Sequence, residues 1–240
     1  MGAVHGVILK YVGLSVAAGL AHVSLEKNSF LSYVMFYVAV LNLFVTVGFM
    51  CNRGTEVLGK NAKTGQLPLW SYVLWAGFIG PTWLYTAVHT FLGKKKGVRE
   101  ADEIFPQWWL GSRYADLVRE RPERFAGIVD LTCELPERLM ADCDDYKLVP
   151  CWDGTPPSIA DIDAAADFCG KKSHHGHILV HCAHGRGRST CVFVAALVKA
   201  GKFDNWQDAF AAVKLRRSAC KLNAKMRTAL QAWQDRYIRK

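Results

Sequence analysis

The segment HCAHGRGRST, residues 181–190, places a thiol among glycines and arginines between two apolar runs. The HILV sequence at 177–180 predicts a short buried strand, and STCVFVAALVKAG predicts a helix that begins at Ser189 and ends at Gly201. Glycines let successive backbone N–H groups turn toward one point, and a helix N-terminus adds about half a positive charge there. The pattern therefore indicates an anion-binding loop between a strand and a helix.

Cys182 is the candidate nucleophile in this loop. The N–H groups and the helix dipole stabilise a thiolate, so a thiol at this position loses its proton more easily than an ordinary cysteine. Arg188 offers a planar fork that matches two oxygens of a phosphate. We therefore expect a thiolate at neutral pH that faces a bound phosphate.

The spacing of Cys182, five residues and Arg188, with His181 before and Ser189 after, closely resembles the signature of the cysteine-dependent protein tyrosine and dual-specificity phosphatases. The resemblance implies that Cys182 attacks phosphorus, Arg188 holds the equatorial oxygens and Ser189 assists breakdown of the thiophosphate. His181 would support the loop. The residues that would wrap the phosphate are Ala183, His184, Gly185, Arg186 and Gly187.

Two other interpretations of the loop are less favoured. A buried structural cysteine beside a solvated basic turn is disfavoured because the strand and helix expected around the motif are both predicted. A sulfurtransferase of the rhodanese type also uses a cysteine in a basic loop. Gly185, Gly187 and the hydroxyl of Ser189 favour the phosphatase.

Asp153 is the candidate general acid for the leaving oxygen. It lies in YKLVPCWDGTPPS, where KLVP predicts a strand and WDGTPP an irregular loop. Taken alone, Asp-Gly is an ordinary turn. Asp153 precedes Cys182 by 29 residues with one helical segment between, which resembles the acid loop of the dual-specificity group. We expect it to act as acid first and as base for water second, with Asp161 and Asp163 as the next candidates.

The resemblance covers about residues 103–238 and implies the fold of the catalytic part. It places the opening strand in 108–117, a second strand in 125–138, an amphipathic helix in IADIDAAADFCGKK and two closing helices that contain Asn223. The expected fold class is α/β, with a central, mostly parallel sheet flanked by helices, over residues 99–240.

Residues 1–98 predict a transmembrane helical region with two or three spans. Segments 30–50 and 67–93 contain no charged residue and are each long enough to cross about 30 Å of hydrocarbon. Segment 6–25 is interrupted by Lys10 and is favoured as a third span over a signal anchor or an interfacial helix. The aromatic residues nearby are expected at interfaces and in packing: Trp70, Tyr72, Trp75, Trp83 and Tyr85.

The cysteines and histidines give no metal site. The eight cysteines form no C-x-x-C pair and indicate reduced thiols, and SHHGH at 173–177 is typical of a solvated helix end. No metal and no cofactor is predicted. The charge flanking the predicted spans is nearly balanced, and the need for a reduced thiolate favours the cytosolic face, or an equivalent reducing face within an organelle, for the catalytic domain.

Charge divides the catalytic part. Residues 94–170 carry 10 basic and 16 acidic side chains, and residues 171–240 carry 15 basic and 3 acidic ones. The basic half suggests anionic head groups or a polyanionic substrate, whereas no motif indicates nucleic acid.

The predicted function is a membrane-anchored phosphatase. Arg186 within the loop is reminiscent of family members that act on phosphoinositides or phosphatidylglycerophosphate, which favours a phosphorylated lipid as substrate. A phosphoprotein phosphatase for phosphotyrosine or phosphoserine/threonine and an inactive phosphate-binding module remain alternatives. The oligomeric state stays open.

Overall fold

The computed structural model describes residues 3–238. Its apolar segments form the central strands of a five-stranded sheet. The sheet order is β1-β2-β5-β3-β4; β1 is antiparallel to β2 and all other neighbours are parallel. Every residue of β2, β3 and β5 is buried, as expected for central parallel strands. The strands are β1 (Ala101–Phe105), β2 (Trp108–Ser112), β3 (Gly127–Thr132), β4 (Tyr146–Cys151) and β5 (Ile178–Cys182).

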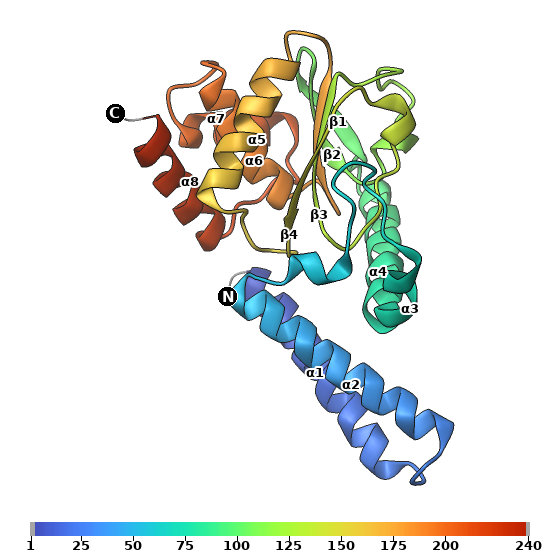
Figure 1. The fold of residues 1–240 in the computed structure, drawn as a ribbon. Helices are drawn as coiled ribbons and strands as arrows, with labels where there is room; N and C mark the ends of the chain where they lie inside the picture. The colour runs from blue at the N-terminus through green and yellow to red at the C-terminus, as the bar shows by residue number, and fades with distance from the viewer. Residues whose placement is uncertain (1–2, 239–240) are drawn as a thin grey trace.

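Four helices cover one face of the sheet (Figure 1): α5 (Ile159–Lys172), α6 (Arg188–Lys199), α7 (Trp206–Arg216) and α8 (Ala224–Tyr237). α6 lies at the centre and is buried from Arg188 to Val198. Side chains cap the other three at their N-termini, where Ser158, Asn205 and Asn223 accept backbone hydrogen bonds.

The other face of the sheet is covered mainly by loops. These loops contain the 3-10 turns Ala115–Leu117 and Met140–Asp142, and buried side chains such as Phe125 and Leu139 pack there. The expected α/β class and mostly parallel sheet are confirmed, with the long helices concentrated on one face.

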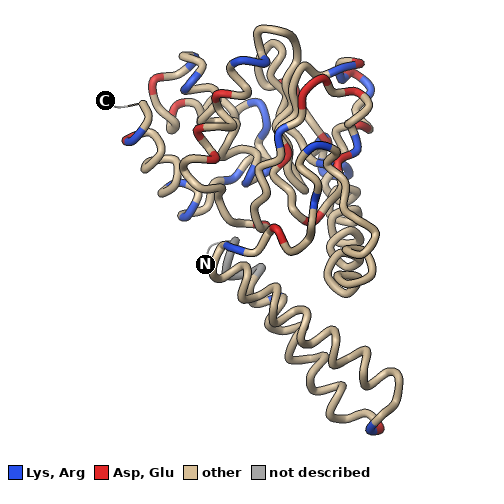
Figure 2. Tube along the Cα trace, in the orientation of Figure 1, with Lys and Arg blue, Asp and Glu red and all other residues tan. Residues whose placement is uncertain are grey.

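A helical hairpin projects from one end of this domain (Figure 1). It consists of α1 (Ala3–Ser24) and α2 (Phe30–Cys51), and in Figure 2 its charged residues lie only at its base and at its tip, where Glu26 and Lys27 stand. Within the described residues, α2 is the one helix long and apolar enough to cross a membrane. Only 28% of its most apolar stretch is buried within the protein, far less than a core helix would require.

The single helix predicted over residues 67–93 is wrong. The segment forms α3 (Leu69–Leu74) and α4 (Ala76–Lys95), separated at Trp75. The Trp75 indole is buried and its Nε1 donates to Val57 O at 3.1 Å, while the Tyr37 hydroxyl donates to Leu74 O at 2.7 Å. At the break between the two helices, the Leu74 carbonyl and the Trp75 indole therefore both have hydrogen-bond partners within the protein.

Contacts cross the predicted domain boundary at residue 98. The 3-10 turn Thr55–Leu58 and Lys60 pack against the catalytic domain, and α4 runs along it. The outermost residues of the two predicted domains, 1–2 and 239–240, lie outside the described part of the chain.

Candidate active site

The loop between β5 and α6 has the backbone of an anion-binding site. Gly185 adopts φ +64°, and a Cβ there would lie 2.4 Å from the carbonyl carbon of Gly111 in β2. Only glycine fits this approach. Gly187 precedes α6 and gives no side-chain cap, which leaves the first N–H groups of the helix available to a ligand.

Cys182 lies at the end of β5, beneath this loop, and its side chain is buried. Its Sγ is 3.3 Å from the Ser189 hydroxyl. Burial acts to raise the pKa of the thiol, but the Arg188 guanidinium and hydrogen bonds from Ser189 and the Arg186 backbone lower the pKa below the ordinary cysteine value. The surroundings of the predicted nucleophile thus favour loss of its proton relative to an ordinary cysteine.

Arg188 is fixed by acceptors around its outer edge. Nη1 donates to Leu131 O at 3.1 Å and to Cys151 O at 2.8 Å, and Nη2 donates to Glu134 Oε1 at 2.8 Å. The Nε atom is buried and has no hydrogen-bond partner among residues 3–238. Since the side chain lines the cavity above Cys182, this donor is available to a phosphate oxygen.

An ion-pair network supports the loop from below. His181 Nε2 lies 2.6 Å from Glu137 Oε2, and Lys60 bonds Asp130 and the carbonyl oxygens of Thr132 and Leu135. Burial acts to lower the pKa of His181, but the nearby carboxylates raise it to about 9. Asp130, Glu137 and His181 are close enough to hold a metal ion. Two side-chain cations, Lys60 and protonated His181, already balance the two carboxylates there.

Asp153 lies at the mouth of the same cavity, after β4. Its Oδ1 is 3.3 Å from Arg188 Nη2, and its side chain is 43% exposed. Gly154 follows with φ +77°, and the amide of Asn223 donates to Gly154 O at 2.7 Å. The predicted acid therefore faces the predicted nucleophile across one cavity.

The alternative acids lie elsewhere. Asp161 accepts the Ser158 hydroxyl at the start of α5, and Asp163 pairs with Lys199 and accepts from Trp233. Neither carboxylate lines the cavity above Cys182.

The residue before Asp153 ties the acid loop to the N-terminal helices. Trp152 is 1% exposed, and its Nε1 donates to Arg53 O at 2.7 Å. Its ring centroid lies 4.8 Å from that of Phe49 in α2 and 6.0 Å from that of Phe78 in α4. Sequence reasoning missed this anchor because an aromatic side chain in a loop does not reveal its partner.

Arg186 and His184 turn toward α4. Arg186 Nη1 is 3.3 Å from His89 Nε2, and the His184 ring centroid is 4.4 Å from that of His89 and 5.7 Å from that of Tyr85. Tyr85, expected at interfaces or in packing, therefore packs against His184 of the catalytic loop. In the sequence, the one sign that α4 contacts the catalytic loop is His89, a titratable residue inside an otherwise apolar run.

The basic C-terminal third also has a structural function. Arg217 is buried, bonds Asp102, and donates from Nε to Gly185 O at 3.0 Å, so it braces the catalytic loop. Lys221 lines the cavity above Cys182. This cavity has a volume of about 390 Å³, enough for a phosphate and part of its leaving group.

Fold and site together give a glycine-rich loop before a helix N-terminus, a thiol with a lowered pKa beneath it and a carboxylate at the cavity mouth. Residues 124–236 match the family model described as "Dual specificity phosphatase, catalytic domain". These findings support the assignment of this domain to the phosphatases of the dual-specificity and protein tyrosine phosphatase superfamily.

Solved structures resemble this fold. A variant of human DUSP28 is 22% identical with a TM-score of 0.51, covering 57% of this chain and 95% of that one. A mouse dual specificity phosphatase complexed with zinc tungstate is 20% identical with a TM-score of 0.50, covering 57% and 87%. PTPMT1 in complex with PI(5)P is 18% identical with a TM-score of 0.49, covering 57% and 96%. At these identities the likeness concerns the fold alone. No curated protein matches the chain.

Proposed function

We propose that the protein is a membrane-anchored phosphatase that hydrolyses a phosphomonoester on a phospholipid head group. The observation that carries the catalytic part is that Cys182, Arg188 and Asp153 line one cavity, with the Ser189 hydroxyl 3.3 Å from Cys182 Sγ. The observation that favours a lipid is that Lys10, Tyr11 and Phe49 of the apolar α1–α2 hairpin line a second cavity, which shares Asp153 and His184 with the catalytic one.

The first chemical step forms a bond between Cys182 Sγ and phosphorus and breaks the bond from phosphorus to the leaving oxygen. The Asp153 carboxyl gives its proton to that oxygen. The free Nε of Arg188 and the N–H groups at the start of α6 stabilise the charge on the transferred group. Substrate must displace the contact between Asp153 and Arg188, which frees the acid to meet the leaving group.

The second step releases phosphate. The Asp153 carboxylate takes a proton from water as the water oxygen attacks phosphorus, and the bond from phosphorus to Cys182 breaks. Ser189, 3.3 Å from Sγ, donates to the departing thiolate. The enzyme then returns to its starting state without a cofactor.

The anchor is assigned to the α1–α2 hairpin. α2 has 22 residues, about 33 Å of helix, and crosses the hydrocarbon of a bilayer. Arg53 after α2, with Lys94, Lys95 and Lys96 at the end of α4, favours the cytosolic side for the catalytic domain. Alkaline carbonate should leave the protein in the membrane fraction, and protease added to the cytosolic side should digest the catalytic domain.

The substrate test compares the full chain in detergent micelles on phosphatidylglycerophosphate, phosphoinositides, a phosphotyrosine peptide and a phosphoserine peptide. A lipid should have the highest kcat/KM, and Cys182→Ser should abolish turnover of all substrates. If either peptide is hydrolysed faster than every lipid, the lipid assignment is wrong and the protein phosphatase is correct. Absence of turnover on every substrate, and on a generic aryl phosphate, would indicate an inactive phosphate-binding module.

A further inference from the structure

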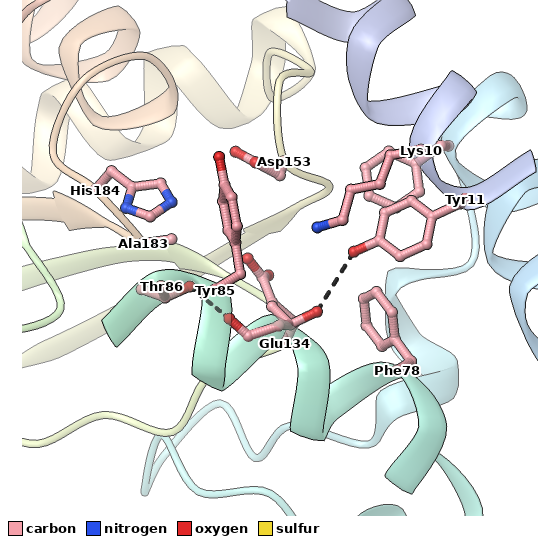
Figure 3. A pocket seen from close by; sticks show the side chains of 11 residues that line it. Lys10, Tyr11, Phe78, Tyr85, Thr86, Glu134, Asp153, Ala183 and His184 are labelled. Atoms are coloured by element: carbon pink, nitrogen blue, oxygen red, sulfur yellow. Dashed lines mark hydrogen bonds between the residues drawn. The ribbon is translucent and has the colours of Figure 1, made fainter. Parts of the chain in front are cut away.

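A second cavity, of about 330 Å³, adjoins the catalytic one (Figure 3). Asp153 and His184 line both cavities, so the two are neighbours on either side of the catalytic loop and acid loop. The outer wall of the second cavity comes from α1, α2 and α4, which lie outside the matched phosphatase domain.

The chemistry of this wall is mixed. The rings of Tyr11, Phe49 and Phe78 supply an apolar side, and the hydroxyls of Thr82 and Thr86 lie on the side of α4. Lys10 is the one lysine or arginine that lines the cavity within the described residues. In Figure 3 its ammonium group points between Tyr85 and Tyr11.

Lys10 is held in place without a carboxylate partner. Its Nζ lies 4.2 Å from the ring centroid of Tyr85 and 5.3 Å from that of Tyr11. Among the described residues, no carboxylate oxygen lies within ion-pair distance of Nζ, although Glu134 and Asp153 line the same cavity. Glu134 is committed to Arg188 through Nη2 at 2.8 Å, and Asp153 also pairs with Arg188. The cation is therefore positioned by rings and available to an anion.

A lysine inside an otherwise apolar helix is costly in a membrane-associated segment and indicates a specific contact. Here the contact faces the catalytic loop at the base of the hairpin. Around it, apolar side chains point outward from α1 and α4, including Leu9, Leu84 and Val88. A ligand that enters from the bilayer would meet this cation before it reaches Cys182.

We infer that the second cavity binds the phosphodiester and glycerol of a phospholipid whose terminal phosphomonoester occupies the catalytic loop. The inference rests on the proposed lipid phosphatase activity and adds its specificity determinant. Lys10 neutralises the diester, the Thr82 hydroxyl faces the glycerol oxygens, and the acyl chains leave along the apolar surfaces of α1 and α4. The substrate class is thus a lipid that carries two phosphates, one diester and one monoester.

The experiment uses three substrates that differ stepwise. Phosphatidylglycerophosphate has the monoester, the diester and acyl chains; its deacylated form lacks the chains; glycerol 3-phosphate has the monoester alone. The variant is Lys10→Met in the full chain, and Lys10→Arg tests rescue by a retained charge. Lys27→Met makes the same substitution at the tip of the hairpin, away from both cavities.

Lys10→Met should lower kcat/KM about tenfold more for the two diester substrates than for glycerol 3-phosphate, mainly through KM, since a charged hydrogen bond to the diester is lost. Lys10→Arg should recover most of that loss, and Lys27→Met should behave as wild type. Equal losses on all three substrates, or a loss confined to the acylated one, would overturn the assignment. If the wild type rejects the acylated lipid but accepts the deacylated compound, the lipid proposal fails while the role of Lys10 is still decided by the other two substrates.

Discussion

Replacing Trp152 by alanine should impair catalysis selectively, because this side chain joins the acid loop to the N-terminal helices. The ring is buried against Phe49 and Phe78, and its Nε1 bonds Arg53 O at 2.7 Å. Truncation of a buried tryptophan costs about 3–5 kcal/mol, of which the hydrogen bond contributes about 1 kcal/mol. The lost stabilisation loosens the acid loop, which positions Asp153.

A displaced acid matters only when the leaving oxygen is basic. We expect Trp152→Ala to lower kcat/KM roughly 10²-fold for glycerol 3-phosphate, within the 10²–10⁴ range of general acid catalysis, and only about threefold for p-nitrophenyl phosphate. Trp152→Phe keeps the ring contacts and loses only the hydrogen bond, so it should lie close to wild type. The double variant Trp152→Ala/Asp153→Asn should be little slower than Asp153→Asn alone, because both changes remove one function.

The assay is steady-state kinetics on both substrates with the full chain in micelles, accompanied by thermal unfolding to confirm that each variant is folded at the assay temperature. Equal losses on the two substrates would refute the reasoning, because they would show that Trp152 supports the phosphate loop as a whole. Additive losses in the double variant would also contradict it.

Three further predictions concern Cys182, Asp153 and His181. Cys182→Ser should reduce aryl phosphate turnover by orders of magnitude while phosphate analogues still bind, and retained turnover would contradict the mechanism. Because Arg188 lowers the pKa of Cys182, iodoacetamide should alkylate this thiol at a lower pH than an ordinary cysteine. Asp153→Asn should slow poor leaving groups about 10²–10⁴-fold and activated aryl phosphates much less, whereas equal losses would indicate a structural role. The pKa of His181 is raised to about 9 from an ordinary value of 6.5, so its stabilisation of the fold is complete below pH 6.5 and lost as the pH rises through 9, up to about 3 kcal/mol. Urea unfolding across this range should show the decline, and Glu137→Gln should flatten it; an unchanged slope in that variant would show that another group is responsible.

The catalytic loop could be predicted from sequence because its determinants are local. The strand, the glycines and the start of α6 follow one another within a short segment, and Gly185 adopts the left-handed backbone that the loop requires. Asp153 was found through its distance from Cys182 along the chain. The pairing that holds Arg188, with Glu134 from the loop after β3, could not be seen because it joins residues 54 positions apart.

The N-terminal region was harder for a physical reason. Hydropathy reports that a segment avoids water but does not distinguish lipid from protein as its surroundings. The run 67–93 is apolar throughout, yet Trp75 docks on Val57 and His89 contacts Arg186. The strand β1 was also missed, because ADEIF carries two acidic residues and only its pairing with β2 makes it a strand.

Two contacts link the N-terminal helices to the candidate active site. Phe49 of α2 packs on Trp152, which directly precedes the acid, and His89 of α4 contacts Arg186 in the phosphate loop. A phosphatase domain without these helices would lack the partners of both side chains. The N-terminal helices therefore pack against both the acid loop and the phosphate loop, so the positions of Asp153 and Arg186 depend on the same packed surface.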